Sequence, residues 1–104
     1  MVKTFTQELT GEKIIEFLKA HKKKLKDDFG VTKIALFGSY ARGQQTKESD
    51  IDVLVELKDV DFKKRFYLKE FLERQFNKTV EIGYFKSVRP YIWEKIEKEI
   101  LYVD

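Results

Sequence analysis

Apolar residues recur at helical spacing between residues 11 and 29 of the chain. Thr10 has the side chain of a helix N-cap, and Gly30 is a residue type that ends helices. At 3.6 residues per turn the apolar positions fall into one stripe. The stripe consists of Ile14, Leu18, His21, Leu25 and Phe29. The pattern predicts one long helix over 11–29 and places His21 in packed core or at its boundary, away from catalysis.

Three segments instead alternate with a period of two, which is typical of β-strands. They are residues 31–37, 51–57 and 79–85. In each segment one face is apolar. In the second and third the other face also carries carboxylates, so we expect a covered face and an open face of one sheet.

Helical signals fill the gaps between the strands. A short helix over 39–42 is enclosed by Gly38 and Gly43, and a longer one is expected from an N-cap at Asp61 to Phe76. Pro90 suits the start of a last helix, because its missing N–H is not needed there. The stripe of that helix is Ile92, Trp93, Ile96 and Ile100. The order α-β-α-β-α-β-α predicts an α+β fold with a small three-stranded mixed sheet covered by helices on one face, in a single domain over residues 1–104.

Composition narrows the function classes. The chain has 104 residues, a net charge of +3 and no cysteine, which excludes disulfides and thiolate metal sites. We expect a cytoplasmic protein, because there is neither a transmembrane-length apolar stretch nor a secretory apolar region. The small net charge does not favour nucleic acid, and the lysine run at 22–24 reads first as a solvated helix face.

Two carboxylates stand at the start of the second strand. Asp50 and Asp52 are two residues apart, so their side chains share a face. Asp50 alone could be a turn residue, but Asp52 lies inside the apolar run, where an unpaired carboxylate is costly to desolvate. A hard divalent cation such as Mg²⁺ would relieve both their repulsion and this cost. We therefore predict that both aspartates ligate a metal.

Glu81 is the corresponding residue of the third strand and faces the same side as the aspartates. It is either a solvated glutamate on an exposed strand or a third site residue. In the second case it ligates a second metal ion or acts as a base toward an attacking hydroxyl.

The turn after the first strand supplies groups that suit an anion. Gly38 permits a tight turn and Ser39 can cap the following helix, a geometry that also offers backbone N–H groups to phosphate. Arg42 could cap that helix, pair with Asp50 or Asp52, or reach nucleotide phosphates. We predict Gly38, Ser39 and Arg42 as nucleotide-binding residues.

These residues resemble a known signature. Gly38-Ser39, ten intervening residues and Asp50-Ile51-Asp52 are similar to the motif of the DNA polymerase β-type nucleotidyltransferase superfamily, and above all to its minimal members, the MNT-domain proteins. The resemblance implies the nucleotidyltransferase fold, Gly38 and Ser39 on the phosphates of ATP, and Mg²⁺ on Asp50 and Asp52. The third acidic residue of the family is usually Asp, so Glu81 departs from the pattern.

The resemblance also implies a partner. Minimal members commonly act as antitoxins of HEPN-domain toxins, and some transfer AMP from ATP to a tyrosine of the toxin. We therefore expect a Mg²⁺-dependent protein adenylyltransferase of a HEPN/MNT toxin–antitoxin pair. The alternatives are an antitoxin that acts sterically with a vestigial nucleotide site, or the catalytic subunit of an aminoglycoside-like small-molecule nucleotidyltransferase.

A chain this short has no evident acceptor-binding domain, so the acceptor is expected to come from another molecule. Tyr40, Tyr91 and Tyr102 fall outside the apolar stripes. We predict that they contribute to a protein-contact surface.

Overall fold

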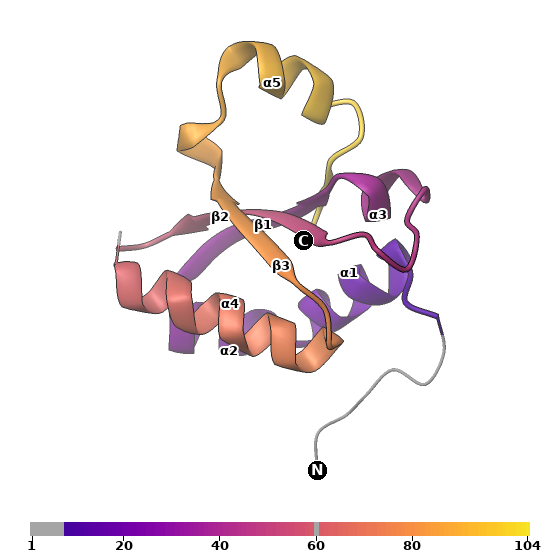
Figure 1. The fold of residues 1–104 in the computed structure, drawn as a ribbon. Coiled ribbons are helices and arrows are strands. Elements are labelled where there is room, and N and C mark those ends of the chain that lie inside the picture. The colour runs from indigo at the N-terminus through magenta and orange to yellow at the C-terminus, as the bar shows by residue number, and fades with distance from the viewer. Residues whose placement is uncertain (1–7, 60) are drawn as a thin grey trace.

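The fold is built on one mixed sheet of four strands in the order β3-β2-β1-β4, as the computed structural model shows for residues 8–59 and 61–104 (Figure 1). Strands β1 and β2 are antiparallel, β1 and β4 are antiparallel, and β2 and β3 are parallel. The strands are β1 (Val31–Phe37), β2 (Ile51–Leu57), β3 (Val80–Tyr84) and β4 (Leu101–Tyr102). The helices are α1 (Gly11–Ala20), α2 (Lys22–Phe29), α3 (Ser39–Arg42), α4 (Phe62–Phe76), the single 3₁₀ turn η1 (Phe85–Ser87) and α5 (Pro90–Ile96).

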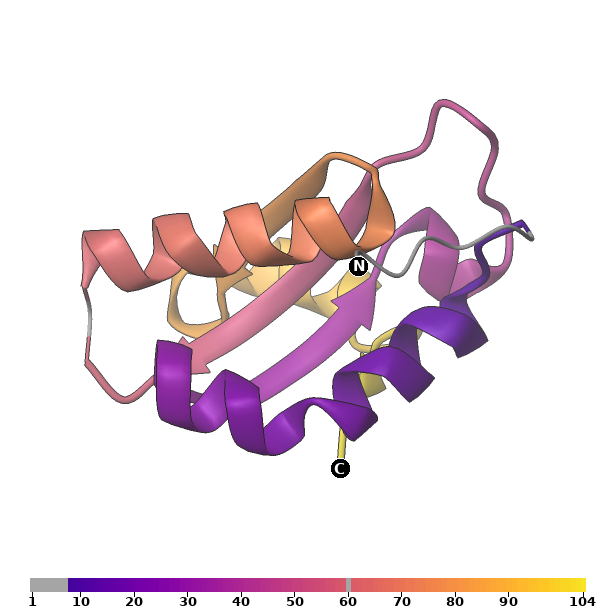
Figure 2. The same ribbon diagram turned by 90° about the horizontal axis from the view of Figure 1, so that it is seen from below.

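Helices α1, α2 and α4 lie together on one face of the sheet (Figures 1 and 2). Their apolar stripes meet the inward-facing residues of β1, β2 and β3 in one core. Ile14, Leu18, Leu68 and Leu72 of the helices and Val55 of β2 have no exposed surface. This burial is the main stabilising contribution to the fold, at about 1.5–3 kcal/mol for each large apolar side chain.

The opposite face of the sheet is covered by much less of the chain. Helix α5 stands over it as an arch between β3 and β4 (Figure 1). Only Ala35, Leu54 and Ile96 are buried apolar residues outside the main core in the described part of the chain. This face therefore stays open around the ends of the strands.

The N-caps predicted at Thr10 and Asp61 are confirmed, whereas the one predicted at Ser39 is wrong, because α3 begins at Ser39 and its N-cap is Gly38. The Thr10 hydroxyl accepts a hydrogen bond from the backbone N–H of Lys13 at 3.2 Å, and the Asp61 carboxylate accepts one from the N–H of Lys63 at 2.8 Å. Each side chain satisfies a donor that has no partner within its helix. The lysine run forms neighbouring ion pairs, Lys23 with Asp27 and Lys24 with Asp28, each at 2.7 Å.

The prediction of one helix over 11–29 is wrong. His21 has φ −108° and ψ 17°, which ends α1 and separates it from α2. Its imidazole stacks on Phe17 at 4.0 Å between ring centroids, and Nδ1 lies 2.9 Å from the Phe17 carbonyl oxygen. The apolar stripe continues across the break because both helices pack into the same core, so periodicity alone does not reveal the bend. His21 is half-buried at that bend, as expected of a boundary residue.

The prediction of three strands is also wrong. Helix α5 ends at Ile96, and Ile100 lies beyond it, just before the fourth strand. Strand β4 pairs only Leu101 and Tyr102 with Leu36 and Ala35 of β1. A strand of two residues has no alternation to detect, and its existence depends on the free edge of β1. The predicted strand over 79–85 is confirmed, one residue shorter at each end.

No helix in the described ranges, 8–59 and 61–104, is both long enough and apolar enough to cross a membrane.

Candidate active site

The turn after β1 lies directly against the acidic start of β2. Antiparallel pairing places Phe37 opposite Asp52, so Gly38 is the next residue beside that carboxylate. Gly38 has φ +77°, and a Cβ atom built on it would lie 2.3 Å from Asp52 Oδ2. Only glycine satisfies both the positive φ and this close approach. The position of Gly38 is therefore explained by its contact with Asp52 as well as by the turn.

The three predicted carboxylates lie on neighbouring strands at the same end of the sheet. Asp52 and Glu81 are register partners in the parallel pairing of β2 and β3, and Asp50 immediately precedes β2. Asp52 is half-buried, whereas Asp50 and Glu81 are exposed. Burial raises the pKa of Asp52 above its ordinary value, and the negative charges of Asp50, Glu81 and Glu99 raise it further, while Arg42 opposes the shift. Several negatively charged side chains thus surround Asp52.

The donor chemistry of this cluster fits Mg²⁺. Carboxylate oxygens are the ligands that Mg²⁺ prefers, and one or two of them suffice when substrate phosphates and water complete the shell. The raised pKa of Asp52 indicates that a positive charge would be favourable there. Within the described residues, no three His, Cys, Asp or Glu side chains are close enough to hold an ion together. Any metal ion held at this cluster would therefore take at most two of these side chains as ligands.

Arg42 does not pair with either aspartate within the described contacts. Its Nη1 donates to Glu99 Oε2 at 2.8 Å, and the Gly38 backbone N–H donates to the same oxygen at 2.8 Å. Sequence reasoning missed Glu99, because it lies 57 residues from Arg42 in a segment predicted as helix. No local signal points to it, since only the return of the chain to β4 brings it to the turn.

A shallow hollow of about 530 Å³ joins these groups. Its wall includes five of the six predicted site residues, namely Gly38, Ser39, Arg42, Asp50 and Asp52. Glu81 is not part of the wall. Helix α5 adds Ile92, Lys95 and Ile96, which the sequence did not identify as site residues. The hollow thus combines backbone and cationic donors with an apolar side and three carboxylates, those of Asp50, Asp52 and Glu99.

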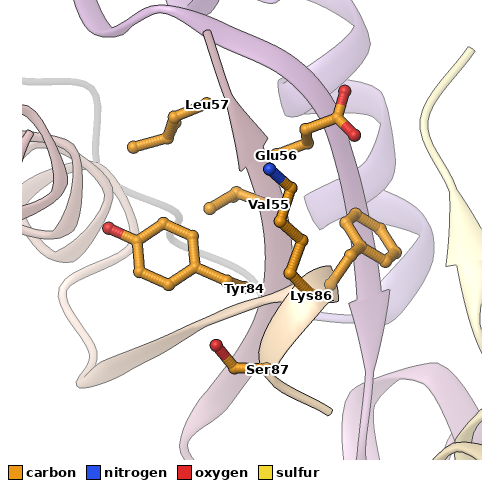
Figure 3. A pocket seen from close by; sticks show the side chains of 7 residues that line it. Val55, Glu56, Leu57, Tyr84, Lys86 and Ser87 are labelled. Atoms are coloured by element: carbon orange, nitrogen blue, oxygen red, sulfur yellow. The ribbon is translucent and has the colours of Figure 1, made fainter. Parts of the chain in front are cut away.

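A second hollow, at the other end of β2, has a different character (Figure 3). It measures about 150 Å³ and is lined by residues 55–57 and 84–87. The residues around it include the apolar side chain of Leu57, the ring of Tyr84 and the charged side chains of Glu56 and Lys86 (Figure 3). It contains none of the motif residues and is separated from Asp52 along the strand.

Of the three tyrosines expected at the surface, two are exposed and one is buried. Tyr91 and Tyr102 are 60% and 42% exposed, as predicted. Tyr40 is 3% exposed and belongs to the core, so its prediction is wrong. The short helix α3 lies against α1 here, with the Tyr40 carbonyl close to Gly11, and the Tyr40 side chain belongs to the core cluster.

Comparison with known proteins agrees with this geometry. The family model for the nucleotidyltransferase domain matches residues 18–103. A Methanocaldococcus jannaschii protein named as a candidate protein adenylyltransferase is 45% identical over 98 residues, which are 90% of this chain and 98% of that protein. The protein adenylyltransferase MntA of Thermococcus cleftensis is 38% identical over 96 residues, or 91% of this chain and 97% of that protein.

Among solved structures, the fold is similar to that in a crystal structure of a toxin–antitoxin with AMP-PNP. The TM-score is 0.66 at 26% identity, over 83% of this chain and 72% of the other. Residues 18–103, which match the family model, include both the glycine turn and the paired aspartates. The chain therefore belongs to the nucleotidyltransferase domain family and is a homologue of its minimal members.

Proposed function

We propose that this protein is a Mg²⁺-dependent adenylyltransferase that moves AMP from ATP to a HEPN-domain toxin and thereby acts as its antitoxin. The observation that carries the proposal is the close packing of the Gly38 backbone against Asp52, with Asp50 beside it and Arg42 across the same hollow. The MntA relative and the toxin–antitoxin structure with AMP-PNP support the reaction class and the kind of partner.

Each group has a role that follows from its chemistry. The Gly38 N–H and the Arg42 guanidinium bind phosphate oxygens, and Ser39 adds a hydroxyl at the same turn. Lys95, in the wall contributed by α5, adds a second cation near the phosphates. These donors hold the nucleotide with its phosphate chain along the turn.

Asp50 and Asp52 would hold Mg²⁺, and Glu81 would serve as the base or as a ligand of a second ion. When bound, the ion neutralises phosphate charge and polarises the phosphorus under attack. The acceptor oxygen forms a bond to the α-phosphorus, the bond from that phosphorus to the bridging oxygen breaks, and pyrophosphate leaves. The acceptor hydroxyl releases its proton to Glu81 if that residue serves as the base.

The direct test uses the intact protein, Mg²⁺, ATP and a purified HEPN toxin. We expect an increase in toxin mass by one or more AMP groups. Asp50→Asn combined with Asp52→Asn abolishes the increase while preserving the fold, because neutral amides remove the ligands together with their repulsion. An unchanged mass of a folded toxin in the presence of the wild-type protein contradicts the proposal.

One observation favours a second candidate, an antitoxin that binds its toxin sterically. Glu81 is exposed, and it does not line the hollow that contains the two aspartates. In this case the double variant still neutralises the toxin in a ribonuclease assay. If AMP transfer is the mechanism, the double variant loses neutralisation together with transfer.

A further inference from the structure

The Glu99 carboxylate occupies the donors that a phosphate would need. Its Oε2 accepts hydrogen bonds from the Gly38 N–H and from Arg42 Nη1, both at 2.8 Å. The Glu99 side chain is 20% exposed, compared with 44% for Arg42. These short contacts pair a partly buried anion with two donors and are the strong, charge-assisted kind.

Backbone hydrogen bonds on both sides of Glu99 hold this segment in place. They keep the Glu99 side chain beside the turn at Gly38. The Glu99 N–H donates to the Ile96 carbonyl at 2.9 Å at the end of α5. On the other side, Leu101 pairs with Leu36, and the Val103 N–H donates to the Ile34 carbonyl at 3.0 Å. The contact with Gly38 and Arg42 is therefore built into the return of the chain to β1.

A carboxylate and a phosphate form hydrogen bonds with the same donors, here the Gly38 N–H and the Arg42 guanidinium. Both present anionic oxygens, and two anions cannot share one N–H and one guanidinium without strong repulsion. We propose that Glu99 is an internal competitor of the nucleotide, whose carboxylate must leave Gly38 and Arg42 before a nucleotide phosphate binds there. This inference rests on the function proposed above and adds to it a residue that sets nucleotide affinity.

Release of Glu99 needs no unfolding of β4. The hydrogen bonds that hold the segment are made by its backbone, so rotation of the Glu99 side chain frees both donors. The apparent Kd for nucleotide is then the intrinsic Kd divided by the fraction of molecules in which Glu99 has left Gly38 and Arg42. The charge of Glu99 also adds to that of the acidic cluster at Asp52, so its departure lowers the local repulsion toward phosphate.

The test measures binding of AMP-PNP with Mg²⁺ by calorimetry to the wild-type protein and to Glu99→Gln, Glu99→Ala and Glu99→Asp. The matched control is Glu97→Gln, an exposed residue of the same segment with the same change of charge. We expect Glu99→Ala to bind about tenfold more tightly than wild type, Glu99→Gln to gain less, and Glu97→Gln to change by less than about twofold.

Glu99→Asp separates direct competition from general repulsion. It keeps the charge but shortens the side chain by one methylene, so it gains affinity only if contact with the donors matters. Equal affinity of wild type and the Glu99 variants overturns the inference, as does weaker binding by Glu99→Ala. Absence of nucleotide binding in all five proteins, each folded by its melting curve, overturns the proposed function and the inference with it.

Discussion

The two faces of the sheet are built from the same strands, but one forms the hydrophobic core and the other carries the acidic residues. The face under α1, α2 and α4 holds the main core, in which Leu72 of α4 and Val55 of β2 are fully buried. The other face buries only Ala35, Leu54 and Ile96 in the described residues, and it carries Asp52 and Glu81.

The contrast arises from strand alternation. Asp52 and Leu54 point to one side of β2, while Val53 and Val55 point to the other. Stability is thus concentrated on one side, and the charged cluster lies on the side with little cover. There burial first, and the neighbouring negative charges second, raise the pKa of Asp52. Each of the following substitutions separates these two roles.

The largest difference is expected between a core residue and a residue of the hollow. Leu72→Ala lowers the free energy of unfolding by about 3 kcal/mol, because it leaves a cavity in the covered face. Ile92→Ala, at a side chain that is 37% exposed in α5, costs about 1 kcal/mol or less. Urea unfolding of both variants measures the difference, and comparable losses would show that the two faces contribute equally to stability.

A glycine pair tests the contact between the turn and Asp52. Gly38→Ala places a methyl group against the Asp52 carboxylate and strains a positive φ, so it destabilises the protein by about 2 kcal/mol and weakens nucleotide binding. Gly43→Ala has a similar φ of +70° but nothing within 4 Å of the new Cβ, and it costs about 1 kcal/mol without loss of binding. Thermal unfolding and AMP-PNP titration distinguish them; equal effects would make the Asp52 contact irrelevant.

The smallest effect is expected from charge removal at the open face. Because the pKa of Asp52 is raised in the folded state, its ionised form opposes folding above that pKa. Asp52→Asn therefore raises the melting temperature at pH 7 in the absence of Mg²⁺. The gain disappears as pH falls through the raised pKa to below the ordinary aspartate range, where the wild-type carboxyl is protonated in both states. A melting temperature at pH 7 below that of the wild type contradicts this sign.

The elements of the fold differ in how well the sequence predicts them. Strands β1, β2 and β3 and helix α4 follow from alternation, periodicity and the Asp61 cap, because each is long enough to carry a pattern. The break at His21 and the two-residue β4 do not follow, because one is a bend inside a continuous stripe and the other needs an existing edge of β1. Tyr40 was misplaced because a four-residue helix has no period of its own.

The sequence by itself determined the motif: a glycine turn, two aspartates on one strand face and a glutamate on the next strand. Residue order and the alternation of strands are enough to place these groups at one end of a sheet. Only the tertiary structure decided that α5 forms a wall of the hollow, that Glu81 lies outside it, and that Glu99 closes on Gly38 and Arg42. These contacts join residues up to 61 positions apart, and such distances are set by the path of the whole chain.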